Sequence, residues 1–237
     1  MEKSFSLQQV LLRYPECNSV DFICTPENLE QKGVNAEFVF ALQELFEEEK
    51  NFREEQFLNF PIEDILDYIV RTHKYYLEKK IQEIEQSIHL LLQDYSDNHP
   101  LLIILNSFFS TYKKSLIDHI NVEEEILIPY IQYLIQADKI GIELNSFMLK
   151  IQDDVLINFI HEHDDTEQDL KDACNAILQY QPPLTNESPY RILLNQLGDF
   201  EKDLAVHALI EDGILLPRAQ EMEQYLIEEF NAKVLLN

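Results

Sequence analysis

Two segments of the sequence share a pattern of residues that can bind a metal ion. Residues 119–129 have the sequence HINVEEEILIP, and residues 207–217 have the sequence HALIEDGILLP. Both segments contain a histidine, then a glutamate, then a proline at matching places. In a helix, positions i and i+4 lie one turn apart on one face. Each His–Glu pair can therefore bind one metal ion together, or its glutamate can bridge two ions.

The prolines of the two segments, Pro129 and Pro217, fall inside what the pattern predicts to be helix. A proline has no backbone N–H and removes one hydrogen bond from a helix. We therefore expect each helix to bend locally beyond its His–Glu pair.

A helical spacing of apolar residues extends through the chain from Ile62 onward. Breaks rich in Pro, Asn, Asp and Gly fall near residues 96–100, 138–141 and 181–186. They separate predicted helices at about 62–95, 101–137, 144–180 and 188–230, and no segment has the alternation of a strand. The sequence therefore predicts an all-α protein with an antiparallel, up-down-up-down four-helix bundle.

The first 55 residues differ from the rest of the chain. They contain Cys17, Cys24 and a helical pattern around 36–49. A charged stretch at 47–55 leads to Phe60-Pro61, a typical helix start. We predict a small helical N-terminal domain over residues 1–55 and the bundle over residues 60–230.

One histidine from each predicted bundle helix falls at nearly the same depth. In an antiparallel bundle, residues equally far from a turn lie side by side, and His73, His119, His163 and His207 meet this condition across each break in succession. The other histidines do not. His89 is too near the bundle end, His99 is in a turn, and His161 points away from His163, so we interpret them as surface or packing residues.

A single histidine on an apolar helix face is usually a packed core residue. Four at one level, with Glu123 and Glu211 one turn beyond two of them, favour a metal site. A buried carboxylate without a partner costs on the order of several kcal/mol, and a cation removes that cost. The predicted metal ligands are His73, His119, Glu123, His163, His207 and Glu211.

The ligand types indicate the metal. Four imidazoles and two carboxylates suit a pair of iron ions, with manganese or zinc as substitutes, whereas structural zinc sites usually contain cysteine. Bundle interiors with inward Glu and His side chains are where di-iron sites occur. Each ion would receive two histidines, Glu123 and Glu211 would bridge, and an oxo or hydroxo bridge would leave a position open for a small ligand.

Composition excludes several classes of partner. The formal net charge is −26, so the surface repels nucleic-acid phosphates and anionic membranes. No apolar run approaches the roughly 20 residues of a membrane span, and Met1-Glu2-Lys3-Ser4 is unlike a signal peptide. The scattered cysteines Cys17, Cys24 and Cys174 do not form a disulfide framework. We expect a cytoplasmic protein.

Several motifs resemble the hemerythrin-like family, also called HHE cation-binding domains, and within it the repair-of-iron-centres (RIC) di-iron proteins. The resemblance spans about residues 60–225 and keeps the family's order of histidines and His-x-x-x-Glu pairs. The motifs are YIVRTH ending at His73, NHP at 98–100, His119-x-x-x-Glu123-Glu124, EHDD around His163, and FEKDL at 200–204 before His207-x-x-x-Glu211. Oxygen-carrying hemerythrins use a further histidine on the third helix, where this chain has Glu167.

The resemblance implies a di-iron protein made under nitrosative or oxidative stress that helps to repair damaged iron–sulfur clusters, by handling nitric oxide or by donating iron. Its partners would be nitric oxide, oxygen and iron–sulfur proteins. The RIC N-terminal domain carries Asp-Phe-Cys-Cys, whereas this chain has Asp21-Phe22-Ile23-Cys24. We therefore expect no role for adjacent thiols, and an idle or structural Cys24 is weighed against a redox one.

Two other functions compete with repair. One is a reversible sensor or carrier of oxygen or nitric oxide. The other is a di-metal oxidase or peroxidase, against which the histidine-rich ligand set argues. The sequence leaves open whether the protein is an enzyme and whether it forms a homodimer. Glu124, Glu125 and Asp212 are interpreted as solvated residues, with proton relay or iron guidance as the alternative, and Cys174 as a core residue.

Overall fold

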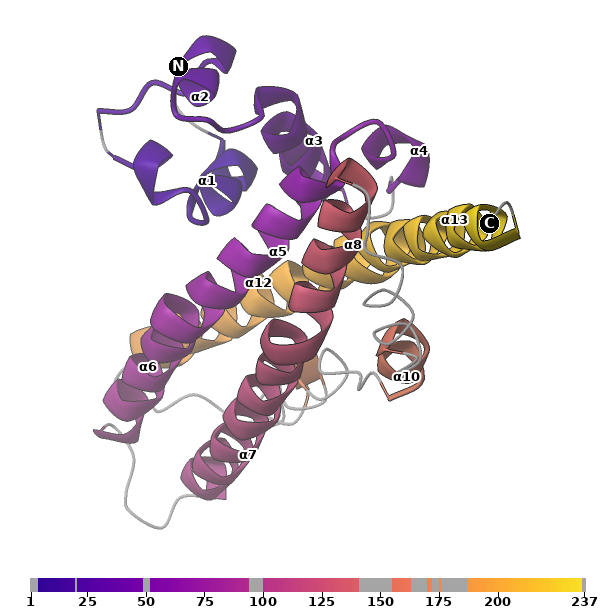
Figure 1. The fold of residues 1–237 in the computed structure, drawn as a ribbon. Helices are drawn as coiled ribbons and strands as arrows, with labels where there is room; N and C mark the ends of the chain where they lie inside the picture. The colour runs from indigo at the N-terminus through magenta and orange to yellow at the C-terminus, as the bar shows by residue number, and fades with distance from the viewer. Residues whose placement is uncertain are drawn as a thin grey trace.

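The fold is all-α in the part of the chain that the structure, a computed structural model, describes (Figure 1). The described residues are 4–19, 21–48, 52–93, 100–140, 155–162, 170–171, 175 and 187–235. Within them the ordered elements are helices, and no strand occurs. No helix in this part of the chain has the length and apolar character needed to cross a membrane.

The N-terminal segment forms three short helices, α1 (Phe5–Leu11), α2 (Pro26–Gln31) and α3 (Ala36–Glu47). Each begins at a side chain that accepts a hydrogen bond from the first turn: Ser4 from Leu7 N, Thr25 from Asn28 N, and Asn35 from Phe38 N. Such caps satisfy backbone N–H groups that have no partner within the helix. Helix α1 packs mainly on α3.

Aromatic rings join this segment to the helices that follow. The short α4 (Glu54–Phe57) lies between α3 and α5 (Ile62–Tyr75). The Phe38 ring meets Phe57, Phe60 and Tyr68 edge to face, at centroid distances of 6.2, 5.2 and 6.1 Å. One buried apolar cluster therefore continues from α1 and α3 into α5 and beyond.

The described helices from Ile62 onward form three long rods, each interrupted by a π-helical turn. The first rod is α5, the turn Tyr76–Lys80 and α6 (Ile81–Gln93). The second is α7 (Pro100–Val122), the turn Glu123–Leu127 and α8 (Ile128–Ile140). The last is α12 (Ser188–Ile210), the turn Glu211–Leu215 and α13 (Leu216–Leu235). These bounds agree with three of the four predicted helices.

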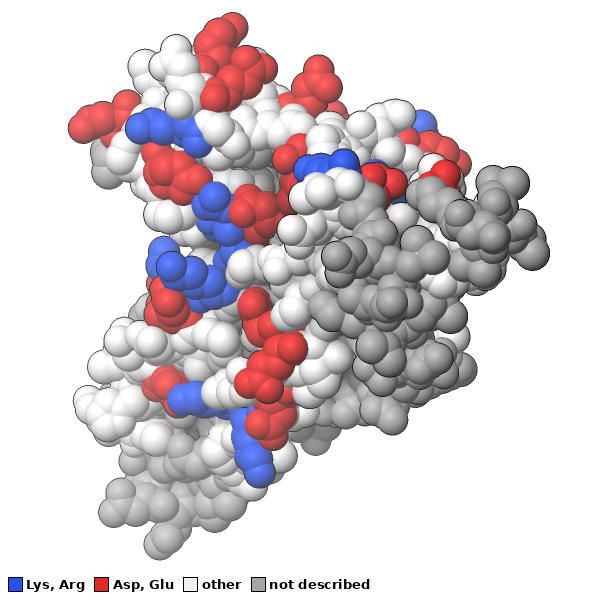
Figure 2. Space-filling view, in the orientation of Figure 1, with Lys and Arg blue, Asp and Glu red and all other residues white. Residues whose placement is uncertain are grey.

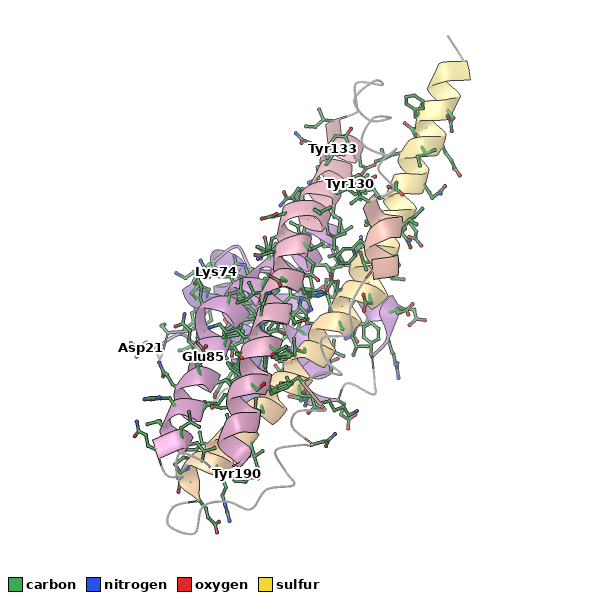
Figure 3. The ribbon with its side chains drawn as sticks, turned by 90° about the horizontal axis from the view of Figure 1, so that it is seen from below. Asp21, Lys74, Glu85, Tyr130, Tyr133 and Tyr190 are labelled. Carbon is green, nitrogen blue, oxygen red and sulfur yellow. The ribbon has the colours of Figure 1, made fainter. Side chains whose placement is uncertain are left out.

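The contacts between the rods set their directions. The end of the first rod, α6, packs on the starts of the other two, α7 and α12, while α8 packs on α13. The second and last rods therefore run together, opposite to the first. Figure 3 shows Tyr190 of α12 at one end and Tyr130 and Tyr133 of α8 at the other.

The region of the third predicted helix is described only in part. Helix α10 (Val155–Glu162) packs on α13 and on the π-helical turn of the second rod. His163, His99, Glu167 and Cys174 lie outside the described residues.

The π-helical turns are wider than an α-helical turn because their hydrogen bonds span five residues. Ile81 N–H donates to Tyr76 O, Ile128 N–H to Glu123 O, and Leu216 N–H to Glu211 O. In the second and last rods the next residue is Pro129 or Pro217, which cannot donate a hydrogen bond. The first rod has the same turn without a proline, so proline is not the only cause.

Candidate metal centre

The three rods bring together all the predicted ligands except His163, at the level of the π-helical turns. His73 Nε2 lies 2.9 Å from Glu123 Oε2 and 3.1 Å from His207 Nε2. His119 Nε2 lies 2.7 Å from Glu123 Oε1, and His207 Nδ1 lies 3.6 Å from Glu211 Oε2. Side chains distant in the sequence therefore converge on Glu123.

This cluster is withdrawn from solvent. His73, Glu123 and Glu211 are at most 1% exposed, and His207 is 6% exposed. His119 is partly exposed at its outer edge. By contrast His89, which the sequence assigns to the surface, is exposed. Polar groups buried to this degree require partners of complementary charge or hydrogen bonding.

Two carboxylates are buried beside each other in the cluster. Burial, and then the charges of Glu123 and Asp212, raise the pKa of Glu211 well above its ordinary value. No donor from the described part of the chain reaches Glu211 Oε1. A second negative charge is therefore unfavourable here unless a cation is bound.

The pKa values of the two buried imidazoles are shifted in opposite directions. Burial acts to lower the pKa of His73, but hydrogen bonds to Glu123 and Glu124 raise it above its ordinary value. Burial and the neighbouring His73 lower the pKa of His207 to about 3. His207 is therefore neutral, and a neutral imidazole has the lone pair that a metal ligand needs.

Glu124 has a role that the sequence did not favour. Its Oε1 lies 2.9 Å from His73 Nδ1, although the side chain is 38% exposed. A carboxylate on one ring nitrogen fixes the ring and directs the other nitrogen to a metal. Glu124 is therefore more than a solvated residue, whereas Glu125 and Asp212 are exposed, as expected.

The imidazoles and carboxylates of the cluster are of the types that bind a metal ion. In this structure their nitrogen and oxygen atoms contact one another. No group of three or more His, Cys, Asp or Glu side chains among the described residues is already arranged to hold an ion. However, ligand atoms about 2.1 Å from one ion and at right angles lie roughly 3 Å apart. His73 Nε2 is close to that distance from both Glu123 Oε2 and His207 Nε2. The spacing of these donor atoms is thus compatible with a shared ion, as it is with the hydrogen bond and ion pair that they form with one another.

Comparisons with known proteins give three informative relatives, although no family model matches the chain. The iron-sulfur cluster repair protein ScdA of Staphylococcus haemolyticus is 21% identical over 202 residues, which cover 83% of this chain and 86% of the relative. ScdA of Staphylococcus epidermidis is 24% identical over 164 residues, or 69% of this chain and 68% of the relative.

The third relative comes from a different genus. The iron-sulfur cluster repair protein YtfE of Musicola paradisiaca is 25% identical over 171 residues, or 72% of this chain and 69% of the relative. These proteins confirm the resemblance predicted from the His and His-x-x-x-Glu motifs: the chain is similar, at 21% to 25% identity, to iron-sulfur cluster repair proteins.

Proposed function

We propose that this protein is a di-iron protein that takes part in the repair of iron–sulfur clusters damaged by nitrosative or oxidative stress. The relatives' names support the repair role. The observation that carries the di-iron part is the pair of buried carboxylates, Glu123 and Glu211, among the imidazoles of His73, His119 and His207. The partners proposed are nitric oxide or oxygen at the metal and iron–sulfur proteins as clients, in the cytoplasm.

The proposed architecture is a four-helix bundle over residues 60–230 with a small helical domain over residues 1–55. The three described rods supply three of the bundle helices, and α10 belongs to the remaining one. His163 directly follows α10 and would be the ligand from that helix. The packing of α10 on α13 supports a bundle of four helices.

The six predicted ligands would hold two iron ions, with two histidines on each ion and Glu123 and Glu211 bridging. The bound iron would supply a site for a diatomic ligand and a store of iron for clusters. The protein orients its ligands: Glu124 fixes the His73 ring through Nδ1. Ile210 and Ile214, which flank Glu211, are fully buried and keep water from that side.

Reversible carriage or sensing of oxygen or nitric oxide is the alternative, and the relatives' names favour repair over it. Cys24 is partly buried, and Cys17 is buried. The proposed mechanism does not use either thiol.

Elemental analysis and a repair assay test the proposal. Protein purified without oxygen should contain about two irons per chain, and Glu123→Ala should lose them. Glu125→Ala is the matched control, because Glu125 lies on the same π-helical turn but is exposed. The loaded protein should reactivate a cluster enzyme inactivated by nitric oxide. Stoichiometric zinc without iron, or no reactivation by the iron-loaded protein, would contradict the proposal.

A further inference from the structure

Arg13 of the N-terminal segment is buried although it carries a charge. Its side chain has no exposed surface and forms an ion pair with Asp203 of α12 through Nη2. Nε donates to Thr72 Oγ1 of α5 at 3.3 Å, and Nη1 donates to Gln9 O of α1 at 2.6 Å. One guanidinium therefore connects α1 with the first and last rods.

The partners of Arg13 lie next to proposed metal ligands. Thr72 immediately precedes His73, and Asp203 is one helical turn before His207. Tyr76 Oη also donates to Asp203 Oδ1, at 2.8 Å, and the Tyr76 ring lies 5.8 Å from the His207 ring. The contacts of Arg13 thus reach the two imidazoles whose Nε2 atoms are 3.1 Å apart.

We infer that Arg13 is a positioning residue for the metal centre: through Thr72, Asp203 and Tyr76 it fixes the spacing of His73 and His207. The inference rests on the proposed function for the role of these histidines. It assigns the N-terminal segment a part in holding the site and does not require thiol chemistry from that segment.

The geometry favours arginine over any other cation at this position. A guanidinium donates in several fixed directions at once, whereas a lysine has one point charge on a flexible stem. Three aromatic rings surround the Arg13 guanidinium at 4.7 Å (Tyr75), 5.3 Å (Phe46) and 5.9 Å (Tyr68). Held from α1, α3 and α5 together, the guanidinium has little freedom to move.

A purely structural role for Arg13 is the competing explanation, and Arg71 provides a matched control. Arg71 also joins the N-terminal segment to α5, through an ion pair with Glu16 at 2.9 Å and contact with the Tyr14 ring at 5.0 Å. Its side chain is 30% exposed, and its ion-pair partners are Glu16 and Asp67, of which Asp67 lies six residues before His73. Arg71 Nη1 also donates to Arg13 O at 3.4 Å, a contact with the backbone of Arg13 and not with its guanidinium.

The test compares Arg13→Met with Arg71→Met in the full-length, iron-loaded protein. The readouts are iron retained per chain against a fixed concentration of chelator and the visible absorption spectrum of the retained iron. Arg13→Met should weaken iron retention about 10- to 100-fold, the effect typical of residues that orient ligands, and should change the spectrum. Arg71→Met should change neither, and Arg13→Lys should restore part of the retention.

Equal iron retention and equal spectra in folded Arg13→Met and Arg71→Met would overturn the inference. If Arg13→Met does not fold, the double variant Arg13→Met/Asp203→Asn takes its place in the same test. The second substitution removes the buried charge of Asp203, which the loss of Arg13 leaves unpaired. Iron retention at the wild-type level in that double variant would also overturn the inference.

The metal-free protein separates this inference from the proposed function. If the wild-type protein binds no iron, the di-iron proposal fails, but the imidazole nitrogen resonances of His73 and His207 still report the spacing. They should shift in Arg13→Met and not in Arg71→Met. Unchanged resonances in both variants would contradict the positioning role.

Discussion

The two His-x-x-x-Glu segments share a sequence pattern but have different surroundings. In the first segment Val122 and Ile126 are 47% and 51% exposed, whereas Ile210 and Ile214, at the equivalent positions of the second, are fully buried. A sequence repeat therefore does not imply equivalent environments.

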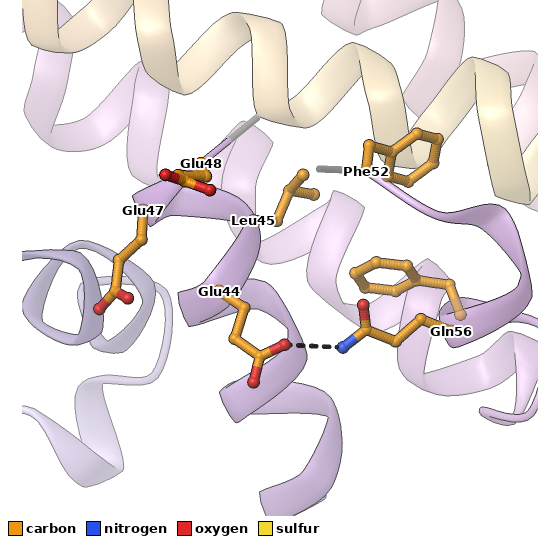
Figure 4. Close-up of a pocket in the computed structure, with 7 residues that line it drawn as sticks. Glu44, Leu45, Glu47, Glu48, Phe52 and Gln56 are labelled. Atoms are coloured by element: carbon orange, nitrogen blue, oxygen red, sulfur yellow. Dashed lines mark hydrogen bonds between the residues drawn. The ribbon is translucent and has the colours of Figure 1, made fainter. Parts of the chain in front are cut away.

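Phe52 and the short helix α4 pack on the second His-Glu segment. Gly213 takes the place that Glu125 has in the first segment, and a Cβ added there would lie 3.1 Å from the Phe52 ring. Phe52 also lines a surface pocket of about 260 Å³ between α3 and α4 (Figure 4). In this pocket Gln56 Nε2 donates a hydrogen bond to Glu44 Oε2. The repeat has diverged where the N-terminal part of the chain packs on it.

The face of the protein in Figure 2 has no patch of a single charge among its described residues. Acidic side chains are spread over the face in Figure 2, with Lys and Arg between them. The difference between the two segments is one of burial.

The glutamates of the two segments also differ. Glu123 lies within 2.9 Å of His73 and His119, whereas Glu211 is 3.6 Å from its nearest histidine nitrogen, on His207. Substitutions at matched positions of the two segments should show which effects on metal affinity and stability the segments share.

The largest effect should come from removing either glutamate of the proposed di-iron site. We expect Glu123→Ala and Glu211→Ala each to lose both irons, a loss of metal affinity greater than about 100-fold, because a bridge is shared by the two ions. Iron and chelator titration would measure this. If one variant kept two irons per chain, the segments would not be equivalent even with metal bound.

The metal-free protein should respond in opposite directions to two matched substitutions. Glu123→Gln removes the carboxylate that pairs with the buried His73 and the partly exposed His119, and it should lower the free energy of unfolding by about 2 kcal/mol. Glu211→Gln should raise it by about 1 kcal/mol, because a glutamine at this buried position avoids the cost of either ionising or protonating the carboxyl group, and its amide can donate to Glu123. Urea unfolding of chelator-treated protein measures both. Changes of the same sign would remove the distinction between the two carboxylates.

The sequence predicted the described rods and much of the candidate centre for local reasons. Apolar spacing and breaks such as the one at 181–186 fix the helix limits, and antiparallel symmetry places His73, His119 and His207 at one depth. The metal-ligand roles of all six residues, the position of His163 and the division between residues 55 and 60 stay predictions.

Features that depend on tertiary packing were missed. Arg13 meets Asp203 only because α1 folds onto the rods, and an arginine is normally expected at the surface. Glu124 reaches His73 on a neighbouring rod, which no spacing within one helix indicates. The π-helical turn at Tyr76–Lys80 carries no proline that could have indicated it.

Lys80, in the π-helical turn of the first rod, is only 5% exposed. Its burial should make the free energy of unfolding depend on pH. Burial lowers the pKa of Lys80, although Asp203, Asp199 and Glu83 act to raise it, and Arg13 lowers it further. Between this lowered pKa and the ordinary one, the unfolded chain binds more protons than the folded chain. The folded state therefore gains stability as the pH rises through that interval.

Lys80→Met removes this dependence. At pH 7 the variant should be more stable than the wild type by about 1 kcal/mol, because it no longer buries a charge. The difference should shrink as the pH approaches the ordinary lysine pKa of 10.5. Unfolding by urea at several pH values measures it. A difference that is constant with pH would show that Lys80 is as well solvated in the folded chain as in the unfolded one.

The smallest predicted effect compares two glycines of the last rod. Gly198 has open space around an added Cβ, and alanine favours a helix by about 1 kcal/mol over glycine, so Gly198→Ala should stabilise the protein by nearly that amount. Gly213→Ala makes the same change against the Phe52 ring, 3.1 Å away, and should stabilise less or destabilise. Thermal unfolding of the metal-free variants measures the difference.

Combining Gly213→Ala with Phe52→Ala removes the opposing ring, so the cost of the alanine at 213 should be smaller in the Phe52→Ala background. Equal stabilisation by the two glycine substitutions would mean that Phe52 yields freely, and that its packing does not distinguish the second His-Glu segment from the first.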